Sequence, residues 1–188
     1  MLKILLLSDL HQQVYVLKNL RGYLKKHKFG GVIIAGDLTN RNKESLDYAK
    51  KFVKIIEENP MEVFFIPGNN ESEDVVNYFE KKKYSVNLRS KSFKGFKIAG
   101  IGGFGEEYYP GNFNIKDTIL ITHFPPILSN KNLKNAPLVH IFGHSHFSEY
   151  KKKRNKTLLV QLKAAIYNRA GILELPSLKV SFINFKNA

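Results

Sequence analysis

Residues 4–11 read ILLLSDLH, and two later stretches repeat this form: VIIAGDLT at 32–39 and VFFIPGNNE at 63–71. Each begins with four apolar residues, as in a strand buried on both faces of a sheet, and then turns polar. Between the stretches, apolar residues recur three or four positions apart, which predicts amphipathic helices. The first helical series is Val14, Leu17, Leu20 and Leu24, and the second runs from Leu46 to Ile56. This β-α-β-α-β alternation predicts a mostly parallel sheet with helices on its faces.

The rest of the chain predicts one more helix, at 73–82, followed by short strands. Strands are expected at 86–89, 96–101, 118–122 and 138–142. Residues 149–154 and 157–162 should form a hairpin that turns at Asn155-Lys156, and 172–175 should pair with 179–185. Two sheets packed together can bury this many strands. The predicted fold class is therefore α/β, with two mixed β-sheets packed as a sandwich and flanked by helices, in a single domain spanning 1–188.

The composition is strongly basic. Lys and Arg number 30 against 16 Asp and Glu, which gives a formal net charge of +14. Such a charge suits a phosphate-bearing substrate or a nucleic acid, but charge alone favours a lysine-rich solvated surface. The chain has no cysteine. This excludes a disulfide scaffold, a cysteine nucleophile and any metal site that needs thiolates.

The sequence predicts neither a membrane span nor an export signal. No stretch approaches the roughly 20 apolar residues of a membrane span. The apolar run Ile4–Leu7 is too short for the apolar region of a signal peptide, and Asp9 follows it closely. We therefore expect a cytoplasmic protein that has no membrane partner.

Side chains able to bind metals follow five of the predicted strands. They are Asp9, His11, Asp37, Asn69, His123, His144 and His146. In α/β sheets, ligands bind beyond the carboxyl ends of the strands, so we expect these residues to meet there. Asp9 and His11 lie two apart in what should be an extended segment and should point the same way. The same expectation holds for His144 and His146.

The chemistry of these seven residues is coherent. They offer carboxylate, imidazole and amide ligands, a set that suits Mn²⁺, Fe²⁺, Co²⁺, Ni²⁺ or Zn²⁺. Seven side chains are too many for one metal that must also hold water, so we expect two metals sharing a carboxylate. Each motif alone is a weak indication, because Asp-x-His is common and Gly-Asp often marks an ordinary turn. The joint occurrence carries the argument, while His27 and His140 are expected to be structural.

Together, these segments resemble the motifs of the calcineurin-like metallophosphoesterase family. The matching segments are Asp9-Leu10-His11, Gly36-Asp37, Gly68-Asn69-Asn70-Glu71, His123 and Gly143-His144-Ser145-His146. The resemblance runs from Leu2 to about Phe147, and as an ordered set it is highly specific. It implies a dinuclear metal-dependent phosphoesterase that hydrolyses phosphate esters with a metal-activated hydroxide. The implied cofactors are two divalent metal ions, with Mn²⁺ as the first candidate.

The resemblance also implies roles for individual residues. One metal would be held by Asp9, His11, Asp37 and His146, and the other by Asp37, Asn69, His123 and His144. The family has a His where this chain has Asn70, and that His stabilises the transition state and protonates the leaving oxygen. Asn70 can donate a hydrogen bond but cannot act as a general acid. Asn69, Asn70 and His144 are the candidate catalytic residues, and Asn70 favours a phosphodiesterase over a monoesterase.

Two alternatives to this function stay open. The first is a nuclease acting on DNA or RNA, which the basic clusters at 25–28, 81–83 and 151–154 favour. The second is a catalytically weak scaffold of the same fold that binds a protein, which Asn70 would allow. For the leading function the expected partner is a small phosphate-ester substrate. Residues 102–114, with Phe104, Tyr108, Tyr109 and Phe113, are either a wall for its base or aryl group or a self-packed surface loop.

Overall fold

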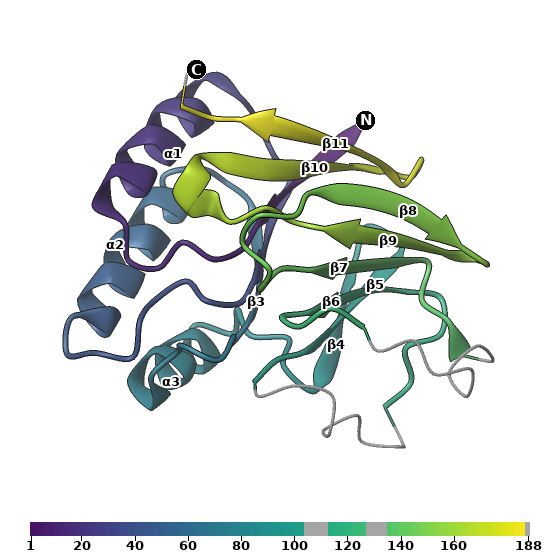
Figure 1. Cartoon of the computed structure of the whole chain (residues 1–188), viewed down its shortest axis with the longest axis horizontal. Coiled ribbons are helices and arrows are strands. Elements are labelled where there is room, and N and C mark those ends of the chain that lie inside the picture. Colours follow the sequence, from purple (N-terminus) through teal and green to yellow (C-terminus); the bar gives the residue numbers. More distant parts are fainter. Residues whose placement is uncertain (104–112, 127–134, 187–188) are drawn as a thin grey trace.

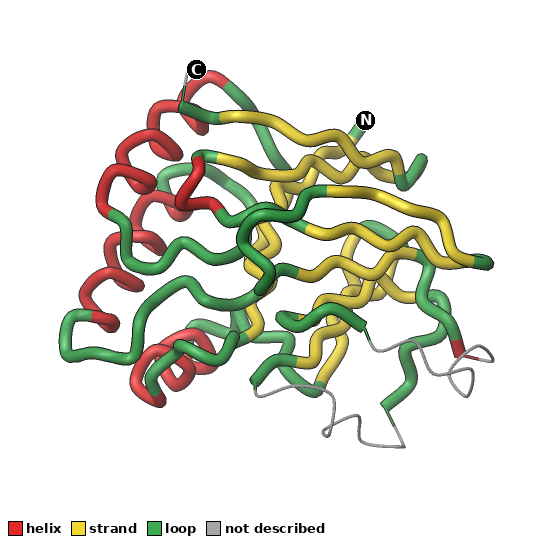
Figure 2. The backbone as a smooth tube through the Cα atoms, in the orientation of Figure 1, coloured by secondary structure: helices red, strands yellow, loops and turns green. Residues whose placement is uncertain are grey.

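The computed structural model describes residues 1–103, 113–126 and 135–186. Two β-sheets pack face to face, and three helices cover the outer face of the first sheet (Figures 1 and 2). The predicted sandwich of two mixed sheets with flanking helices is therefore confirmed. None of the helices in the described parts of the chain is long and apolar enough to span a membrane.

The first sheet has the strand order β11-β10-β1-β2-β3. Its strands are β1 (Leu2–Leu7), β2 (Gly31–Ala35), β3 (Glu62–Ile66), β10 (Arg169–Leu175) and β11 (Lys179–Asn184). The first three run parallel, while β10 and β11 are antiparallel additions at one edge. In β1, Leu5 and Leu7 face the helices while Ile4 and Leu6 face the second sheet. Because both faces are covered, the strand must be apolar throughout, as its sequence is.

The second sheet has the order β4-β5-β6-β7-β9-β8. Its strands are β4 (Arg89–Phe93), β5 (Phe96–Ile101), β6 (Thr118–Thr122), β7 (Val139–Phe142), β8 (Tyr150–Arg154) and β9 (Thr157–Gln161). The predicted hairpin is confirmed, since β8 and β9 pair antiparallel and Asn155 has a φ of 51°, as a tight turn requires. The predicted strand at 86–89 is wrong. Only Asn87 forms an isolated bridge to Gly100, and regular pairing begins at Arg89.

The helices are α1 (Val14–Lys26), α2 (Ser45–Glu57) and α3 (Glu73–Lys81). Their positions agree with the prediction, but one residue of the apolar face does not. Val14, at the first position of α1, is 72% exposed, and Val16 is buried instead. A short 3-10 turn, η3 (Ala165–Tyr167), was not predicted.

Candidate metal centre

All seven predicted metal-binding residues gather at one edge of the sandwich. Three strands of the first sheet, β1, β2 and β3, deliver Asp9, His11, Asp37 and Asn69 just beyond their carboxyl ends. Two strands of the second sheet, β6 and β7, deliver His123, His144 and His146. The site therefore lies where the carboxyl edges of both sheets meet, which is where an α/β architecture places its ligands.

Four of these residues form a compact cluster. One ligand atom from each of Asp9, His11, Asp37 and His146 lies within 4.8 Å of the others. The Nε2 atoms of His11 and His146 are 3.0 Å apart, and Asp37 Oδ2 lies 3.7 Å from His11 Nε2. His11 Nδ1 lies 2.8 Å from Asn40 Oδ1, which can only accept. His11 therefore carries its proton on Nδ1 and presents the Nε2 lone pair to the cluster.

Asp9 supplies the clearest sign that this cluster suits a cation. Its side chain is fully buried, and its Oδ1 atom forms no hydrogen bond with any residue that the structure describes. His146 Nε2 lies 3.3 Å from this oxygen and forms an ion pair with it only when the imidazole is protonated. A buried carboxylate oxygen without a donor is costly, and a coordinated cation would remove that cost. The donor set of carboxylates and imidazoles fits divalent transition metals.

A second group of acceptors converges on the same Asp37 oxygen, Oδ2. His123 Nδ1 donates to the carbonyl oxygen of Ala35 at 2.9 Å, so in the neutral form of the ring the lone pair sits on Nε2. That Nε2 lies 3.1 Å from Asn69 Oδ1 and 3.3 Å from Asp37 Oδ2. Three acceptor atoms facing one another need a proton or a cation between them. The ring of His144 completes this group, with its centroid 5.1 Å from that of His123.

The charges in the site perturb one another. Burial alone would raise the pKa of Asp37, but its contact with His123 and two hydrogen bonds from Asn70 lower the pKa to about 2. Burial alone would lower the pKa of His123, but Asp37 and Asp9 outweigh it and raise the pKa. Burial and the neighbouring His123 charge lower the pKa of His144. A neutral His144 ring is the form that can ligate a metal.

The backbone at the site differs from the prediction. Asp9 and His11 were expected in an extended segment, yet their φ angles are 57° and 46°, in the left-handed region. His144 and His146 behave alike, with φ of 69° and 54°. Left-handed non-glycine residues are uncommon and cost about 1–3 kcal/mol each, and they concentrate at functional sites. The side chains converge because the loops turn at these left-handed residues, and not because side chains alternate along an extended strand.

Two glycines allow these loops to approach one another. A Cβ added at Gly143 would lie 2.6 Å from Asp9 Oδ2, and one added at Gly68 would lie 2.5 Å from the peptide nitrogen of Asp37. Real Cβ contacts are essentially never that short. Glycine is therefore required at both positions for the loops from different strands to close around the site.

Two further residues support the site, and the sequence analysis assigned neither a role. Glu71 is 4% exposed and accepts hydrogen bonds from the peptide nitrogens of Asp37, Thr39 and Gly68. Burial, followed by the charge of Asp37, raises the pKa of Glu71 to about 7. Asn40 holds His11 from both sides, because its Nδ2 also donates to the His11 carbonyl oxygen at 3.1 Å. The only feature of the sequence that could have indicated this supporting role is the position of Glu71 directly after Asn69-Asn70.

Asn70 contacts Asp37 rather than open space. Its peptide nitrogen donates to Asp37 Oδ1 at 2.9 Å, and its side-chain Nδ2 donates to Asp37 Oδ2 at 2.7 Å. Hydrogen bonds to an ionised carboxylate favour the charged form. Asn70 therefore holds Asp37 ionised and in a fixed orientation between the two groups of ligands.

The other expected binding features lie elsewhere. Phe104, Tyr108 and Tyr109 of the predicted substrate wall lie outside the described residues, while Phe113 packs against a small cluster around Ile101 and Ile115. His140 is 4% exposed and 2.9 Å from Thr122 Oγ1, in agreement with a structural role.

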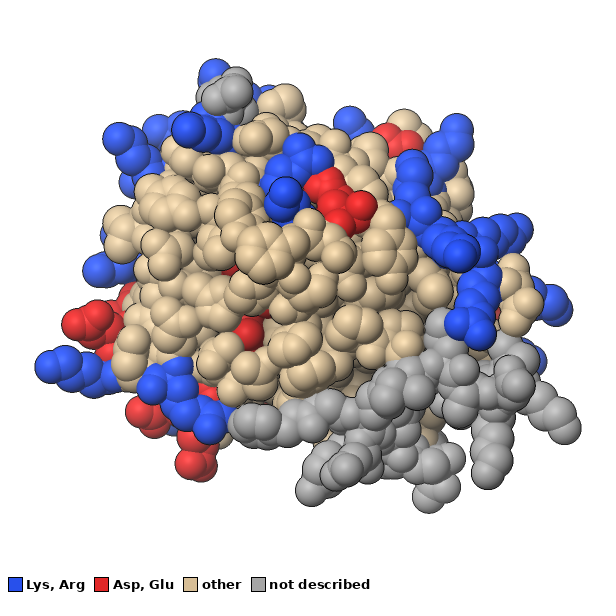
Figure 3. Space-filling view, in the orientation of Figure 1, with Lys and Arg blue, Asp and Glu red and all other residues tan. Residues whose placement is uncertain are grey.

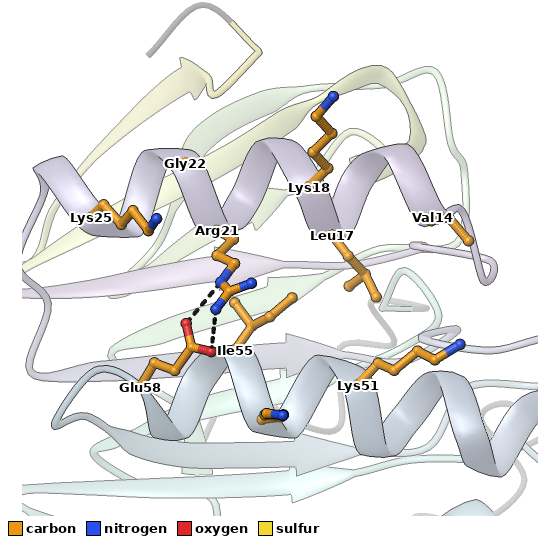
Figure 4. A pocket seen from close by; sticks show the side chains of 10 residues that line it. Val14, Leu17, Lys18, Arg21, Gly22, Lys25, Lys51, Ile55 and Glu58 are labelled. Carbon is orange, nitrogen blue, oxygen red and sulfur yellow. Dashed lines mark hydrogen bonds and ion pairs between the residues drawn. The ribbon is translucent and has the colours of Figure 1, made fainter.

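Among the described residues, most basic side chains lie away from the metal centre, but Arg41 donates a hydrogen bond to the carbonyl oxygen of Asn69 at 3.3 Å. Lysines and arginines lie mainly around the rim of the face in Figure 3, and a small acidic area shows among uncharged atoms at its centre. A groove of about 530 Å³ between α1 and α2 is lined by basic side chains, but it contains none of the seven ligands (Figure 4). Its lining includes Lys18, Arg21, Lys25, Lys51 and Lys54. Arg21 spans the groove and binds Glu58 at 2.7 and 2.8 Å.

Known structures share this fold. Protein TT1561 of Thermus thermophilus is 15% identical, with a TM-score of 0.74 over 97% of this chain and 98% of its own. A protein described as a novel archaeal phosphodiesterase is 16% identical, with a TM-score of 0.67 over 97% and 99%. The phosphoesterase YfcE from E. coli is 11% identical, with a TM-score of 0.55 over 98% and 100%. At these identities the likeness shows the fold alone.

The sequence itself carries the family relationship. No curated protein matches the chain. Residues 2–170, however, match the family described as Calcineurin-like phosphoesterase, and this range includes every strand-end residue of the site. Members of this family typically bind two divalent metals, in keeping with the His and Asp cluster. The chain belongs to the calcineurin-like phosphoesterase family.

Proposed function

We propose that this protein is a dinuclear metal-dependent phosphodiesterase. The observation that carries the proposal is the cluster of Asp9, His11, Asp37 and His146, with ligand atoms within 4.8 Å and the buried Asp9 Oδ1 lacking a hydrogen bond among the described residues. Family membership supports phosphoester chemistry. A protein of the same fold is described as an archaeal phosphodiesterase, and the diester preference proposed for this chain rests on Asn70.

The chain's own residues have distinct tasks in this proposal. Asp9, His11, Asp37 and His146 hold one metal, and Asp37, Asn69, His123 and His144 hold the other. When bound, two divalent metals would neutralise phosphate charge and activate a water near neutral pH. Asn40 fixes the His11 tautomer, and the carbonyl oxygen of Ala35 fixes that of His123.

Asn70 underlies the preference for diesters with good leaving groups. An amide cannot protonate a leaving oxygen, and general acid catalysis is typically worth 10²–10⁴-fold. The Asn70 side chain is also engaged with Asp37 Oδ2. An aryl diester, whose leaving group is stable without a proton, should therefore be the best test substrate.

The test is hydrolysis of bis(p-nitrophenyl) phosphate compared with p-nitrophenyl phosphate, by metal-depleted protein to which Mn²⁺ or Ni²⁺ is added. We expect metal-dependent turnover that favours the diester. Asp37→Ala should abolish activity because both metals lose a shared ligand, while Asn70→His should raise or broaden it. Lys50→Ala, at an exposed position on α2, is the control for effects of preparing and assaying a variant protein.

Two results would contradict the proposal. Folded protein that binds two metals yet turns over no diester with any of Mn²⁺, Ni²⁺, Co²⁺ or Zn²⁺ would remove the catalytic assignment. Unchanged turnover by Asp37→Ala would remove the bridging role. Short DNA and RNA oligonucleotides belong in the same panel, since faster cleavage of these would identify a nuclease.

A further inference from the structure

An exposed aromatic pair lies beside the metal centre. Phe147, which directly follows His146, is 73% exposed, and Tyr167 is 40% exposed. Their ring centroids are 5.8 Å apart at an angle of 40°, and the Phe147 ring lies 6.4 Å from that of His146. Lys163 Nζ stands 5.2 Å from the Tyr167 centroid. We call Phe147, Lys163 and Tyr167 the aromatic platform.

The platform is fixed to the same backbone that carries the candidate ligands. Ala164, next to Lys163, donates its peptide N–H to the carbonyl oxygen of His146 at 3.0 Å. Ala165, the first residue of η3, donates to the carbonyl oxygen of Ser8 at 2.8 Å, beside Asp9. In Figure 1, η3 is the short lime-coloured turn before β10, and the green loop between β7 and β8 passes close to it. The platform therefore keeps its position relative to His146 and Asp9.

The chemistry of the platform fits a planar ring that is attached to an anionic phosphate. Two exposed rings at stacking distance offer a face to another planar ring, and stacking of a base on an aromatic side chain is sequence-tolerant. The Lys163 ammonium adds a positive charge beside that face, which complements an anionic phosphate. A purely apolar partner would gain nothing from Lys163, and a free phosphate would gain nothing from the rings.

We propose that the aromatic platform binds the planar base of a nucleoside phosphodiester while its phosphate lies at the metal centre. This inference rests on the proposed phosphodiesterase function and names its substrate class. Phe147 supplies the stacking face, Tyr167 supports it, and Lys163 draws the phosphate-bearing end. Residues 102–114 were predicted to form either such a wall or a self-packed surface loop, whereas the platform comes from 147 and 163–167.

Binding of the nucleotide product tests the platform without requiring turnover. Isothermal titration of the Mn²⁺-loaded protein compares adenosine 5′-monophosphate with ribose 5-phosphate, which has the same phosphate but no base. We expect the adenosine compound to bind more tightly. Phe147→Ala should weaken its binding about 5- to 160-fold, the range for losing one base stack, and should leave the affinity for ribose 5-phosphate unchanged. Tyr150→Ala is the control, because Tyr150 is 43% exposed, close to the 40% of Tyr167, and packs on Phe142 rather than on the platform.

The outcomes separate the platform from the proposed function. One outcome is that the protein hydrolyses no diester, binds the adenosine compound more tightly than ribose 5-phosphate, and loses this preference in Phe147→Ala. That outcome supports the platform and overturns the proposed phosphodiesterase function. Diester turnover with equal binding of both compounds, or with no effect of Phe147→Ala, overturns the platform alone. A concentration-dependent dimer that Phe147→Ala dissociates in sedimentation velocity also overturns it, because a second copy would then cover the rings.

Discussion

Glu71→Gln should loosen the whole metal centre although Glu71 touches no expected metal. Its two carboxylate oxygens accept three peptide N–H groups, from Asp37 and Thr39 at 3.1 Å each and from Gly68. These donors belong to the loops after β2 and β3, so Glu71 ties together the segments that carry Asp37 and Asn69. Burial and the charge of Asp37 raise the pKa of Glu71 to about 7, and measurements at pH 8 therefore keep it ionised.

The size of the effect follows from counting donors and acceptors. Glutamine has one side-chain oxygen, so one of its orientations leaves Thr39 N–H facing an NH₂ group, and the other orientation leaves both Asp37 and Gly68 without an acceptor. A buried donor without a partner costs about 1–3 kcal/mol. For a chain of this length, each kcal/mol lowers Tm by about 2–4 °C. The affinity for Mn²⁺ should fall as well, because the Asp37 peptide loses its anchor.

Thermal unfolding by circular dichroism and Mn²⁺ titration by calorimetry measure both effects. Glu44→Gln is the matched control, an exposed position whose side chain should change stability by no more than about 0.5 kcal/mol. The reasoning is refuted if Glu71→Gln unfolds within about 1 °C of the parent protein, the span expected of the control, and binds Mn²⁺ equally well.

Three other results are expected. Gly143→Ala places a Cβ against Ser8 Oγ and 2.6 Å from Asp9 Oδ2, and should sharply weaken Mn²⁺ binding. Unchanged Mn²⁺ affinity in this variant would contradict the crowding. Gly22→Ala in α1, where nothing lies within 4 Å of the added Cβ, should instead raise stability by about 0.5–1 kcal/mol. Burial lowers the pKa of His140 to about 3, so below a pH of about 6.5 the unfolded state binds a proton at this residue that the folded state does not, which costs about 2 kcal/mol of stability by pH 5. Because Glu71, with a pKa of about 7, acts in the opposite direction, the measurement is the difference in urea-unfolding free energy between the parent protein and His140→Gln, which should change by about that amount between pH 7 and pH 5. Mn²⁺ at about 100 times its Kd should stabilise the protein by about 2.7 kcal/mol in the same assay, reversibly with chelator, and Asp9→Ala should abolish that gain.

The strands of the first sheet were predictable because burial on both faces leaves little choice of residue. Ile4–Leu7 has to be apolar at every position, since Leu5 and Leu7 contact the helices while Ile4 and Leu6 contact the second sheet. The segment at 86–89 failed for the opposite reason. Only Val86 in it is a fully buried apolar side chain, and Leu88 is 52% exposed with a φ of 55°, so no regular pairing holds the segment.

The gathering of the site residues was predictable, but the path of the backbone that gathers them was not. Placing Asp9, Asp37 and His123 beyond strand ends requires only the order of apolar and polar residues. The left-handed φ of Asp9, His11 and His146 depends on hydrogen bonds between loops that are far apart in sequence. One such bond joins His11 N to the Asp37 carbonyl oxygen at 3.1 Å. Local propensity contains no information about contacts of that kind, although Asp and His enter the left-handed region more readily than most non-glycine residues.

Asn70 links the fold to the chemistry more closely than its sequence position suggests. A substitution at the family's acid position first reads as the loss of a catalytic group. In the structure the same side chain donates to Asp37 Oδ2 at 2.7 Å, while the adjacent Glu71 carboxylate holds the Asp37 peptide. Consecutive residues thus fix the side chain and the backbone of the one carboxylate shared by both ligand groups. Asn70→His therefore gains a proton donor for the leaving oxygen but loses a hydrogen bond that keeps Asp37 ionised. If Asn70 also positions Asp37, Asn70→His should raise kcat for poor leaving groups and at the same time weaken Mn²⁺ binding. If the position matters only for acid catalysis, the Mn²⁺ affinity should stay unchanged.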